Sequence, residues 1–371
     1  MRILHIGKFY APIEGGIESI TRFVVESLKG HSSRVFSFNN CNRSCEDDVD
    51  EIPVIRCSSW GILASQPLSL IYYFHLRRIV RMFHPDVIHF HYPNPLGALY
   101  MLLVIGKHRK LVVHWHSDVV AQRFLRHFVK PIEIRLLRRA DAIIATSPNY
   151  VEASPFLSRF RNKTTIIPNS INEQELDLKP GEEAEVERIR AKYGGKPIVF
   201  FLGRHVEYKG LEYLLEAERL ISRDCVFLIA GQGPLTGRLK SQFHSNRLHW
   251  LGRVSEAEKR LYYHAASIFA FPSITRNEAF GVVLAEAMYC QCPAVTFSIN
   301  GSGVNWVSLD DETGIEVKER NPQAYAQAID RLLGDDSLRQ ELGRRAKKRV
   351  CAFFSAETVS NQYRKLYTIL N

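Results

Sequence analysis

The sequence predicts an α/β protein with two doubly wound parallel sheets in series, and three observations lead to this expectation. Short β-branched runs alternate with segments of helical periodicity through both halves of the chain. The runs are apolar almost throughout, which is typical of parallel strands that helices cover on both faces. The alternation pauses at 168–171, passes through a polar, acidic stretch and then starts again. With 371 residues, 46% of them apolar, the chain is long enough for two domains of ordinary size.

The alternation gives each expected element in turn. In the first half we expect strands at 2–7, 34–38, 86–91, 110–114 and 142–146, and helices at 17–28, 70–83, 95–105 and 121–139. In the second half we expect strands at 197–202, 225–230, 247–251, 268–271, 294–297 and 314–316, with helices between them and a last helix at 356–370. We therefore place the first domain at 1–170 and the second at 171–350.

The composition argues against several classes of protein. The start of the chain predicts a strand that meets a polar turn, not a secretory signal. The longest near-apolar stretch, 95–106, is shorter than the ~20 residues that span a bilayer. Seven cysteines without a C-x-x-C pair argue against a disulfide framework and favour a reducing, cytoplasmic location.

The positive charge is concentrated in the first half. Residues 1–170 carry nine more Lys and Arg than Asp and Glu, whereas residues 171–371 carry one more. This predicts an anionic partner, either a membrane surface, a phosphorylated lipid or a nucleic acid. The segments 76–83 and 123–128 interleave cations with aromatics, as helices on anionic headgroups do, although solvated helix faces would look the same. We expect no nucleic-acid partner, because no helix-turn-helix, zinc finger or aromatic RNA platform is apparent.

Two carboxylates, Glu278 and Glu286, stand eight positions apart around a predicted helix start. Residues 273–277 predict a loop, and 281–288 predict the start of a buried helix. A rise of ~1.5 Å per residue would separate the carboxylates by roughly 12 Å, close to the span of a sugar, a diphosphate and a ribose. Free N–H groups at the helix start could bind an anion, and Gly281 would let it approach the backbone. The pattern suits a nucleotide-sugar; two solvated glutamates on an amphipathic helix are the alternative.

Cations and glycines follow the first strand of each half. Arg204 and Lys209 flank the loop after the first strand of the second half, where ligands of open α/β sheets bind. Arg can bind phosphate oxygens through two N–H groups, and Lys acts as a mobile point charge. A helix-initiating Lys209 and a surface ion pair of Arg204 are the alternative. Gly15-Gly16 opens the first helix and could expose backbone N–H groups to a phosphate, or could simply form a tight turn.

Histidines gather at the ends of two expected strands. His89 and His91 share one strand face, and so do His114 and His116. Imidazoles suit zinc, but histidines at strand ends more often satisfy backbone groups, so we expect no metal site. The segment 48–50 has the D-x-D pattern of metal-dependent transferases, yet we expect it in a solvated acidic loop without a flanking strand.

The spacing of Glu278 and Glu286 resembles the glutamate-x7-glutamate signature of retaining glycosyltransferases with the GT-B fold, especially glycosyltransferase family 4. Other motifs recur in the family's order along nearly the whole chain: 15–16 resembles its glycine loop, 203–210 its G-R-x(n)-K-G element, and 231–234 its G-x-G-P turn. The resemblance implies two Rossmann-like domains that face each other across a cleft, with 351–371 returning to the first domain.

The resemblance also implies the role of each site residue. Arg204 and Lys209 would bind the donor diphosphate, Glu278 the sugar hydroxyls and Glu286 the ribose. His116 would lie near the donor sugar, although the sequence leaves open whether it or His114 faces the cleft. The other implied donor-binding residues are Gly15, Gly16, Gly203, Gly231, Gly233, Arg253, Val254, Ala279, Phe280, Gly281 and Val282.

We therefore predict a retaining hexosyltransferase that needs no metal or other cofactor, because Arg204, Lys209 and the helix start would stabilise the charge of the leaving phosphate. GDP-mannose is the favoured donor, since 275–281 is similar to mannosyl- and rhamnosyl-type transferases of bacterial O-antigen and exopolysaccharide. The expected acceptor is a polyprenyl-diphosphate-linked oligosaccharide, with the enzyme in the cytoplasm or peripheral at the inner membrane face. The alternative is a GT-B transferase or epimerase that uses a UDP-sugar with a small soluble acceptor.

Overall fold

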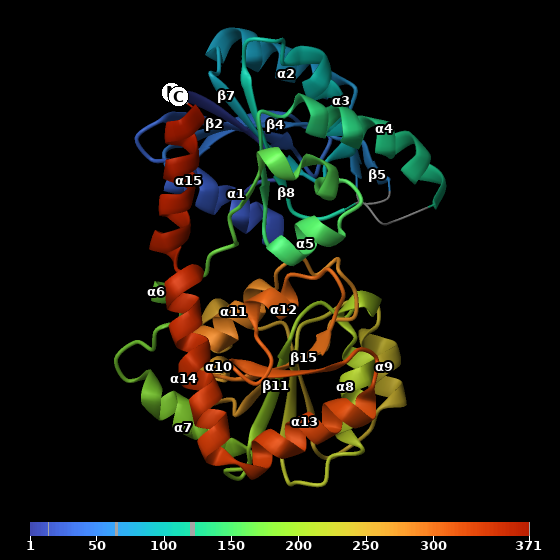
Figure 1. Cartoon of the computed structure of the whole chain (residues 1–371), viewed down its shortest axis with the longest axis vertical. Coiled ribbons are helices and arrows are strands. Elements are labelled where there is room, and N and C mark those ends of the chain that lie inside the picture. The colour runs from blue at the N-terminus through green and yellow to red at the C-terminus, as the bar shows by residue number, and fades with distance from the viewer. Residues whose placement is uncertain (14, 64–65, 119–122, 371) are drawn as a thin grey trace. The chain divides into compact units, whose positions relative to one another are not determined.

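The structure is a computed structural model that describes residues 1–13, 15–63, 66–118 and 123–370, without the side chains of 123–126. It divides into two compact units (Figure 1). Unit 1 comprises residues 1–169 together with the segment that begins at Val359, and unit 2 is Ser170–Thr358. The first boundary therefore lies at 169/170, where the sequence predicts 170/171, and the second at 358/359, where the sequence predicts 350/351.

Unit 1 is built on an eight-stranded sheet of order β10-β9-β8-β7-β1-β2-β4-β3. Its strands are β1 (Arg2–Ile6), β2 (Ser32–Phe38), β3 (Cys45–Val49), β4 (Ile52–Cys57), β7 (Val87–Tyr92), β8 (Lys110–Trp115), β9 (Ala142–Ala145) and β10 (Thr164–Ile166). All neighbours pair in parallel except β3 and β4. The central strand β7 is buried at every residue, in agreement with its apolar sequence.

Helices cover this sheet, and a small hairpin adjoins it (Figure 1). They are α1 (Gly16–Ser27), α2 (Ile71–Phe83), α3 (Pro95–Val104), α4 (Arg123–Arg139), α5 (Pro148–Ala153), the 3-10 helix η1 (Leu157–Lys163) and α15 (Ala356–Leu370), and the hairpin is β5 (Gly61–Leu63) with β6 (Gln66–Leu68). The starts of α3 and α5 show why these helices form where they do. Asn94 and Ser147 cap them by accepting hydrogen bonds from backbone N–H groups, and a proline follows each cap.

The segment that begins at Val359 packs on unit 1. The Ser27 and Ser360 hydroxyls lie 2.8 Å apart, and Arg364 donates to the Ser27 carbonyl oxygen. Tyr363 and Tyr367 of α15 are fully buried in the same apolar cluster as residues of α1, β7 and β8. This segment therefore completes the core of unit 1.

The first half contains strands that the sequence analysis missed. Residues 48–50 were expected in a loop without a flanking strand, but Asp48 and Val49 end strand β3, which pairs with β4 in an antiparallel hairpin. The expectation was wrong because β3 is an edge strand, and edge strands tolerate charged side chains. An ion pair between Arg56 and Asp47 joins the two strands of the hairpin.

Unit 2 is built on a six-stranded, wholly parallel sheet of order β13-β12-β11-β14-β15-β16. The strands are β11 (Ile198–Leu202), β12 (Val226–Ala230), β13 (Leu248–Gly252), β14 (Ile268–Phe271), β15 (Ala294–Ser298) and β16 (Gly314–Lys318). The helices are α6 (Glu173–Leu176), α7 (Glu182–Lys192), the 3-10 helix η2 (Glu207–Lys209), α8 (Leu211–Glu218), α9 (Thr236–Gln242), α10 (Glu256–Ala265), α11 (Val282–Tyr289), α12 (Val304–Val307), α13 (Pro322–Gly334) and α14 (Asp336–Phe353). Every strand that the sequence predicts in this half is present.

Candidate functional site

In unit 2 the chain reverses its direction of travel across the sheet between β11 and β14. Strands β12 and β13 lie on one side of β11, and β14 to β16 lie on the other. At such a switch point the loops after two neighbouring strands diverge and leave a crevice at their carboxyl ends. The loop 203–210 after β11 and the loop 272–281 after β14 flank this point, so Arg204, Lys209 and Glu278 lie at the edge where a ligand is expected.

The two loops at the switch point are tied to each other. The Ile274 N–H donates to the Tyr208 carbonyl oxygen over 2.9 Å. Gly210 has a positive φ of 62°, and a Cβ added there would lie 2.0 Å from the Pro272 carbonyl oxygen. A glycine is therefore required for the two loops to pass this closely.

Lys209 and Glu278 form an ion pair across the switch point. Their side chains are 12% and 13% exposed. The Ser273 hydroxyl donates to the Glu278 carboxylate over 3.3 Å, and the Ser302 hydroxyl donates to the Glu278 carbonyl oxygen. The Lys209 ammonium also lies 5.1 Å from the centre of the Phe271 ring. Two residues to which the sequence analysis gave separate roles thus form one electrostatic unit.

Glu286 lies on α11 and faces α10. The Lys259 ammonium donates to one of its carboxylate oxygens over 3.0 Å, and the Tyr263 hydroxyl donates to the other over 2.9 Å. Burial, reinforced by the Glu286 carboxylate, holds the pKa of Tyr263 well above its usual value, so this hydroxyl keeps its proton. The estimate of 12 Å between Glu278 and Glu286 needs correction, because α11 begins only at Val282 and the helical rise does not apply before it.

Glycines join the loops that follow β11, β12 and β13. The Gly231 N–H donates to the Gly252 carbonyl oxygen over 2.6 Å, and the His205 N–H donates to the Gln232 carbonyl oxygen over 3.2 Å. Gly231 has a φ of 108°, and a Cβ there would lie 1.9 Å from the Gly203 carbonyl oxygen. The three loops therefore pack closely together at the carboxyl ends of these strands.

A pocket of about 500 Å³ opens on this edge. Its lining residues are Arg204, Gln232, Gly233, Thr236 and Arg253. Both arginine side chains are exposed, and neither forms an ion pair with any described residue. Two guanidinium groups without acidic partners can bind phosphate oxygens through paired N–H groups. Lys209 is not among the residues that line this pocket.

The remaining predicted residues of unit 2 support this edge. Gly281 has a positive φ of 87° and precedes the first turn of α11. Ala279 and Phe280 are buried, and the Phe280 ring contacts the Phe354 ring edge to face. Val254 and Val282 are half-buried against the core. These residues can offer a ligand only their backbone groups or a small part of their surface.

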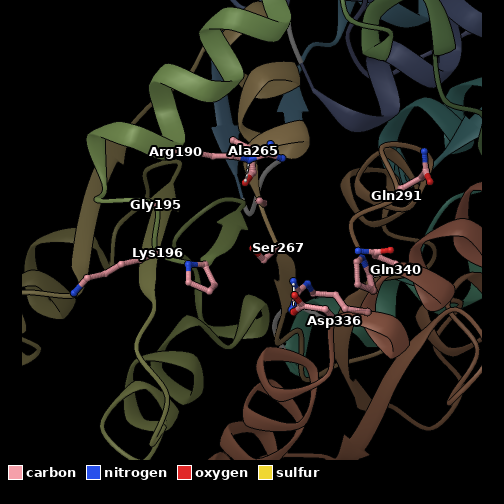
Figure 2. A pocket seen from close by; sticks show the side chains of 12 residues that line it. Arg190, Gly195, Lys196, Ala265, Ser267, Gln291, Asp336 and Gln340 are labelled. Carbon is pink, nitrogen blue, oxygen red and sulfur yellow. Dashed lines mark hydrogen bonds and ion pairs between the residues drawn. The ribbon is translucent and has the colours of Figure 1, made fainter.

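Unit 2 has a second pocket, of about 440 Å³, and Figure 2 shows the side chains that line it. Pro197, Ser267 and Pro293 line it, and they precede β11, β14 and β15, so the pocket lies at the amino ends of the strands. Its charges are engaged, since Arg339 pairs with Asp336 over 2.8 Å. Ligands of open α/β sheets bind at the carboxyl ends, and we therefore do not assign the donor to this pocket.

In unit 1 the predicted residues follow β1 and β8. Gly15 caps the start of α1, and a Cβ on it would lie 2.2 Å from the Glu18 carboxylate, whereas Gly16 has open space around it. His116 follows β8 and is 6% exposed, while His114 is completely buried. Burial lowers the pKa of His116 to about 3, so its imidazole is neutral near pH 7. Of the two histidines that the sequence left open, His116 is the one with some exposure.

Sequence reasoning missed the partners of the two glutamates. Lys259 and Tyr263 bind Glu286, and Ser273 and Ser302 fix Glu278. The i, i+4 spacing of Lys259 and Tyr263 places them on one face of α10, which was the available signal, but that spacing does not identify the helix they face.

The comparisons with known proteins agree with this architecture. Residues 182–349 match the family model described as glycosyl transferases group 1, and residues 15–170 match the glycosyl transferase 4-like domain. The chain is 31% identical to the D-rhamnosyltransferase WbpZ of Pseudomonas aeruginosa, over 96% of this chain and 93% of that protein. It is 28% identical to the O-antigen chain mannosyltransferase C of Escherichia coli, over 100% of this chain and 99% of that one.

Solved structures show the same fold. The sucrose-phosphate synthase of Thermosynechococcus elongatus superposes with a TM-score of 0.81 and 22% identity, over 100% of this chain and 98% of that chain. WaaG, a glycosyltransferase involved in lipopolysaccharide biosynthesis, superposes with a TM-score of 0.71 and 12% identity, over 97% and 99%. These likenesses confirm the predicted fold class, GT-B with two Rossmann-like domains.

Proposed function

The chain belongs to the group 1 glycosyltransferases (family 4), and from this premise we propose that it transfers a mannosyl group from GDP-mannose, with retention of anomeric configuration, to a lipid-linked O-antigen type glycan. That it is a hexosyltransferase follows from family membership. The donor sugar, the stereochemistry, the acceptor and the residue roles are parts of the proposal.

The observation that carries the proposal is the pair of guanidinium groups on the pocket at the carboxyl edge of the unit 2 sheet. Arg204 and Arg253 line a pocket of about 500 Å³, without an ion pair to any described residue. A nucleoside diphosphate carries its charge between two hydroxyl-rich ends. A cavity with two free cations on a sheet edge suits that distribution better than it suits a neutral sugar.

Breaking the bond between the anomeric carbon and the diphosphate leaves negative charge on the departing phosphate. Positioned cations stabilise such charge most when they are fixed before the reaction. Arg204, Lys209 and the amino end of α11 supply this stabilisation in our proposal, and Glu278 binds hydroxyls of the sugar. Glu278 and the Phe271 ring hold the Lys209 ammonium at the switch point before the donor binds.

The donor proposal rests on relatives that match almost the whole chain. The D-rhamnosyltransferase and the O-antigen chain mannosyltransferase are named for 6-deoxyhexose and hexose groups of closely related shape. A pocket that accepts mannose should tolerate loss of the 6-hydroxyl at modest cost. We therefore propose GDP-mannose as the better donor and GDP-rhamnose as the main competitor.

An anionic membrane surface is the proposed location of the acceptor. Unit 1 exposes large apolar side chains near the β5–β6 hairpin and the start of α2: Trp60, Ile62, Leu63, Leu70, Ile71 and Phe74. Arg77, Arg78 and Arg81 on α2 are also exposed. Apolar residues beside cations are what interfacial helices use on anionic lipid, at about 1 kcal/mol per basic residue. The side chains of Arg123 and Arg126, which the sequence analysis included, lie outside the described residues.

No helix in the described part of the chain has both the length and the apolar character needed to cross a bilayer. Peripheral association is therefore the form of membrane contact that we propose. Sedimentation with phosphatidylglycerol vesicles tests it: the double variant Arg77→Glu/Arg78→Glu should bind several-fold less, and the control Arg344→Glu/Arg345→Glu on α14, which removes the same charge, should bind as the wild type does. Equal binding by all three proteins would contradict the proposal.

The donor is tested with a panel of GDP- and UDP-sugars and a polyprenyl-diphosphate-linked acceptor, with products identified by mass spectrometry and anomeric NMR. We expect GDP-mannose to be used most efficiently and an axial, retained linkage to form. Efficient use of a UDP-sugar with a small soluble acceptor would instead favour the alternative activity. Inversion at the anomeric carbon would refute the retaining assignment.

A brief assay in EDTA tests the role of the protein's own cations. We expect initial rates within about two-fold of those without chelator, because Arg204, Lys209 and α11 carry the charge stabilisation. A strict requirement for added manganese or magnesium would contradict this part of the proposal.

A further inference from the structure

Five histidines lie together on one face of the unit 1 sheet. His5 on β1 is the register partner of His89 on β7, and His91 on β7 is the register partner of His114 on β8. His116 follows β8 and stacks on His114 with ring centroids 4.0 Å apart. The proposed transfer reaction uses at most His116, so the cluster needs another explanation.

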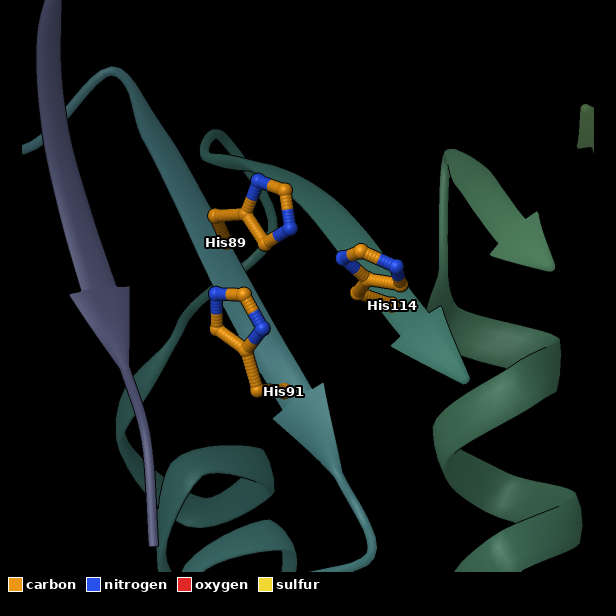
Figure 3. Close-up of side chains that lie close together, drawn as sticks. All are labelled: His89, His91 and His114. Atoms are coloured by element: carbon orange, nitrogen blue, oxygen red, sulfur yellow. The ribbon is translucent and has the colours of Figure 1, made fainter. Parts of the chain in front are cut away.

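Three of these imidazoles bring nitrogen atoms together. One ring nitrogen of each of His89, His91 and His114 lies within 4.8 Å of the other two, and all three side chains are at most 1% exposed. Figure 3 shows the first two rings one above the other along β7, with the His114 ring beside them on β8. Two histidines spaced i, i+2 on one strand and a third on its neighbour therefore share one small space.

The hydrogen bonds of these rings leave other ring nitrogens without a partner among the described residues. His89 uses Nδ1, which lies 2.7 Å from the Tyr367 hydroxyl, and His91 uses Nδ1, which lies 3.1 Å from His116 Nε2. Among the described residues, Nε2 of both rings and both nitrogens of His114 have no hydrogen-bond partner. Each buried polar atom left in this way costs about 1–3 kcal/mol.

Two of the rings share a feature with histidines that bind metals. Such a histidine binds the ion through one nitrogen, and its other nitrogen is held by a hydrogen bond that fixes the tautomer. His89 and His91 already have the second bond, through Tyr367 and His116. Burial keeps the imidazoles neutral, as ligands must be, because it holds the pKa values of all three well below the usual range.

We propose that His89, His91 and His114 bind a divalent transition-metal ion of the zinc class inside unit 1. Three imidazoles and no thiolate are a ligand set that zinc accepts. Bonds of about 2.0–2.1 Å would bring the ligand nitrogens to roughly 3.3 Å from one another, so the rings draw together when the ion binds. The Tyr363 hydroxyl, buried and without a partner among the described residues, lies on a ring 6.0 Å from that of His114 and provides a further polar group beside the ion.

The site is distinct from the pocket of unit 2 and touches the proposed transfer chemistry only through His116, which hydrogen-bonds to His91. It lies within the core of unit 1 beneath α15, because Tyr363 and Tyr367 of that helix contact His114 and His89. The metal would therefore stabilise unit 1 and fix α15 on the sheet. Its loss would lower stability, whereas failure of the donor proposal would leave the metal unaffected.

Metal content of the full chain, purified without a histidine tag and passed over a chelating resin, tests the proposal. We expect about one equivalent of zinc per chain by mass spectrometry of the metal, or uptake of one equivalent with a rise in melting temperature when zinc is added. His91→Gln and His114→Gln should each reduce the bound metal at least ten-fold. His108, an exposed histidine shortly before β8, provides a matched control, since His108→Gln should retain the metal.

A second measurement keeps the test independent of how the variants fold. Cobalt(II) added to the wild-type chain should give the intense visible absorption of a four-coordinate, nitrogen-rich site. Less than about one tenth of an equivalent of any metal, with no change in melting temperature on adding zinc, would overturn the proposal and leave ordered water as the partner of these nitrogens. Metal that stays bound in both ligand variants, or a weak octahedral cobalt spectrum, would overturn it as well.

Discussion

The buried histidines make the stability of unit 1 depend steeply on pH below neutrality. Burial lowers the pKa of His5 and that of His116 to about 3, and it holds the pKa values of His89, His91 and His114 well below the usual range. In the unfolded chain each imidazole returns to about 6.5. Between the two values the unfolded chain binds protons that the folded chain does not, so stability is lost as the pH falls from about 6.5 towards 3.

The size of the effect follows from the number of protons. One histidine contributes a slope of about 1.4 kcal/mol per pH unit below its unfolded pKa, and from pH 7 to pH 5 it costs about 2 kcal/mol. His5 and His116 together then cost about 4 kcal/mol, and His89, His91 and His114 add to this loss in the same direction. A typical domain is stable by only about 5–15 kcal/mol, so unit 1 should lose a substantial part of its stability between pH 7 and pH 5.

Hydrogen–deuterium exchange of the β7 and β8 amides at pH 7, 6 and 5, corrected for the intrinsic rate, measures the opening of unit 1 itself. His5→Leu should reduce the slope by about 1.4 kcal/mol per pH unit, because it removes one buried imidazole, whereas the exposed-site control His108→Gln should not change it. Protein with and without zinc is measured separately, since protons compete with a bound metal. Equal protection at pH 7 and pH 5, or imidazoles that protonate near pH 6 in the folded protein, would refute the reasoning.

Three further outcomes are expected in unit 2. Lys209→Ala and Glu278→Ala should each reduce kcat on the order of 10²–10³-fold, and near-normal turnover in either variant would contradict the assignment. The double variant should regain the stability that each single variant loses, because no unpaired charge remains. Arg253→Ala should weaken binding of the nucleotide-sugar about ten-fold or more by calorimetry, as expected for loss of a charged hydrogen bond, and unchanged binding would exclude its side chain from the donor site. Gly231→Ala should lower the free energy of unfolding by about 2 kcal/mol or more, because of its positive φ and the nearby carbonyl. The control Gly237→Ala, in open space on α9, should raise it by about 0.5–1 kcal/mol. Equal melting temperatures for the two variants would show that the loop adapts.

The parallel strands could be predicted because burial on both faces leaves a direct trace in the sequence, a short run of apolar residues. Strand β3 left no such trace, since it is charged and packs on one neighbour only. The partners of individual side chains were harder to predict than the helices and strands. That Glu286 binds Lys259 depends on how α10 packs against α11, and nothing in the sequence fixes that packing.

The histidines show the same limit for a site. The sequence places His89, His91, His114 and His116 on strand ends, but His5 joins them only through the register of β1 with β7. More importantly, the expectation that these imidazoles satisfy backbone groups depended on hydrogen bonds that no sequence reveals. The structure shows ring nitrogens without partners among the described residues, and the metal proposal starts from this observation.

The pairing of Lys209 with Glu278 has a consequence for how product leaves. Each glutamate of the motif holds a lysine, Glu278 with Lys209 and Glu286 with Lys259, whereas Arg204 on the pocket has no acidic partner in the described residues. A diphosphate that binds Lys209 must therefore compete with a carboxylate, and that carboxylate can retake the lysine once the sugar has gone. Glu278→Gln removes the competitor and keeps the shape, so we expect it to bind GDP about ten-fold more tightly by calorimetry while turnover falls. Because a purely structural Glu278 would leave GDP binding weaker or unchanged, either of those results would show that the carboxylate does not control the charge of Lys209.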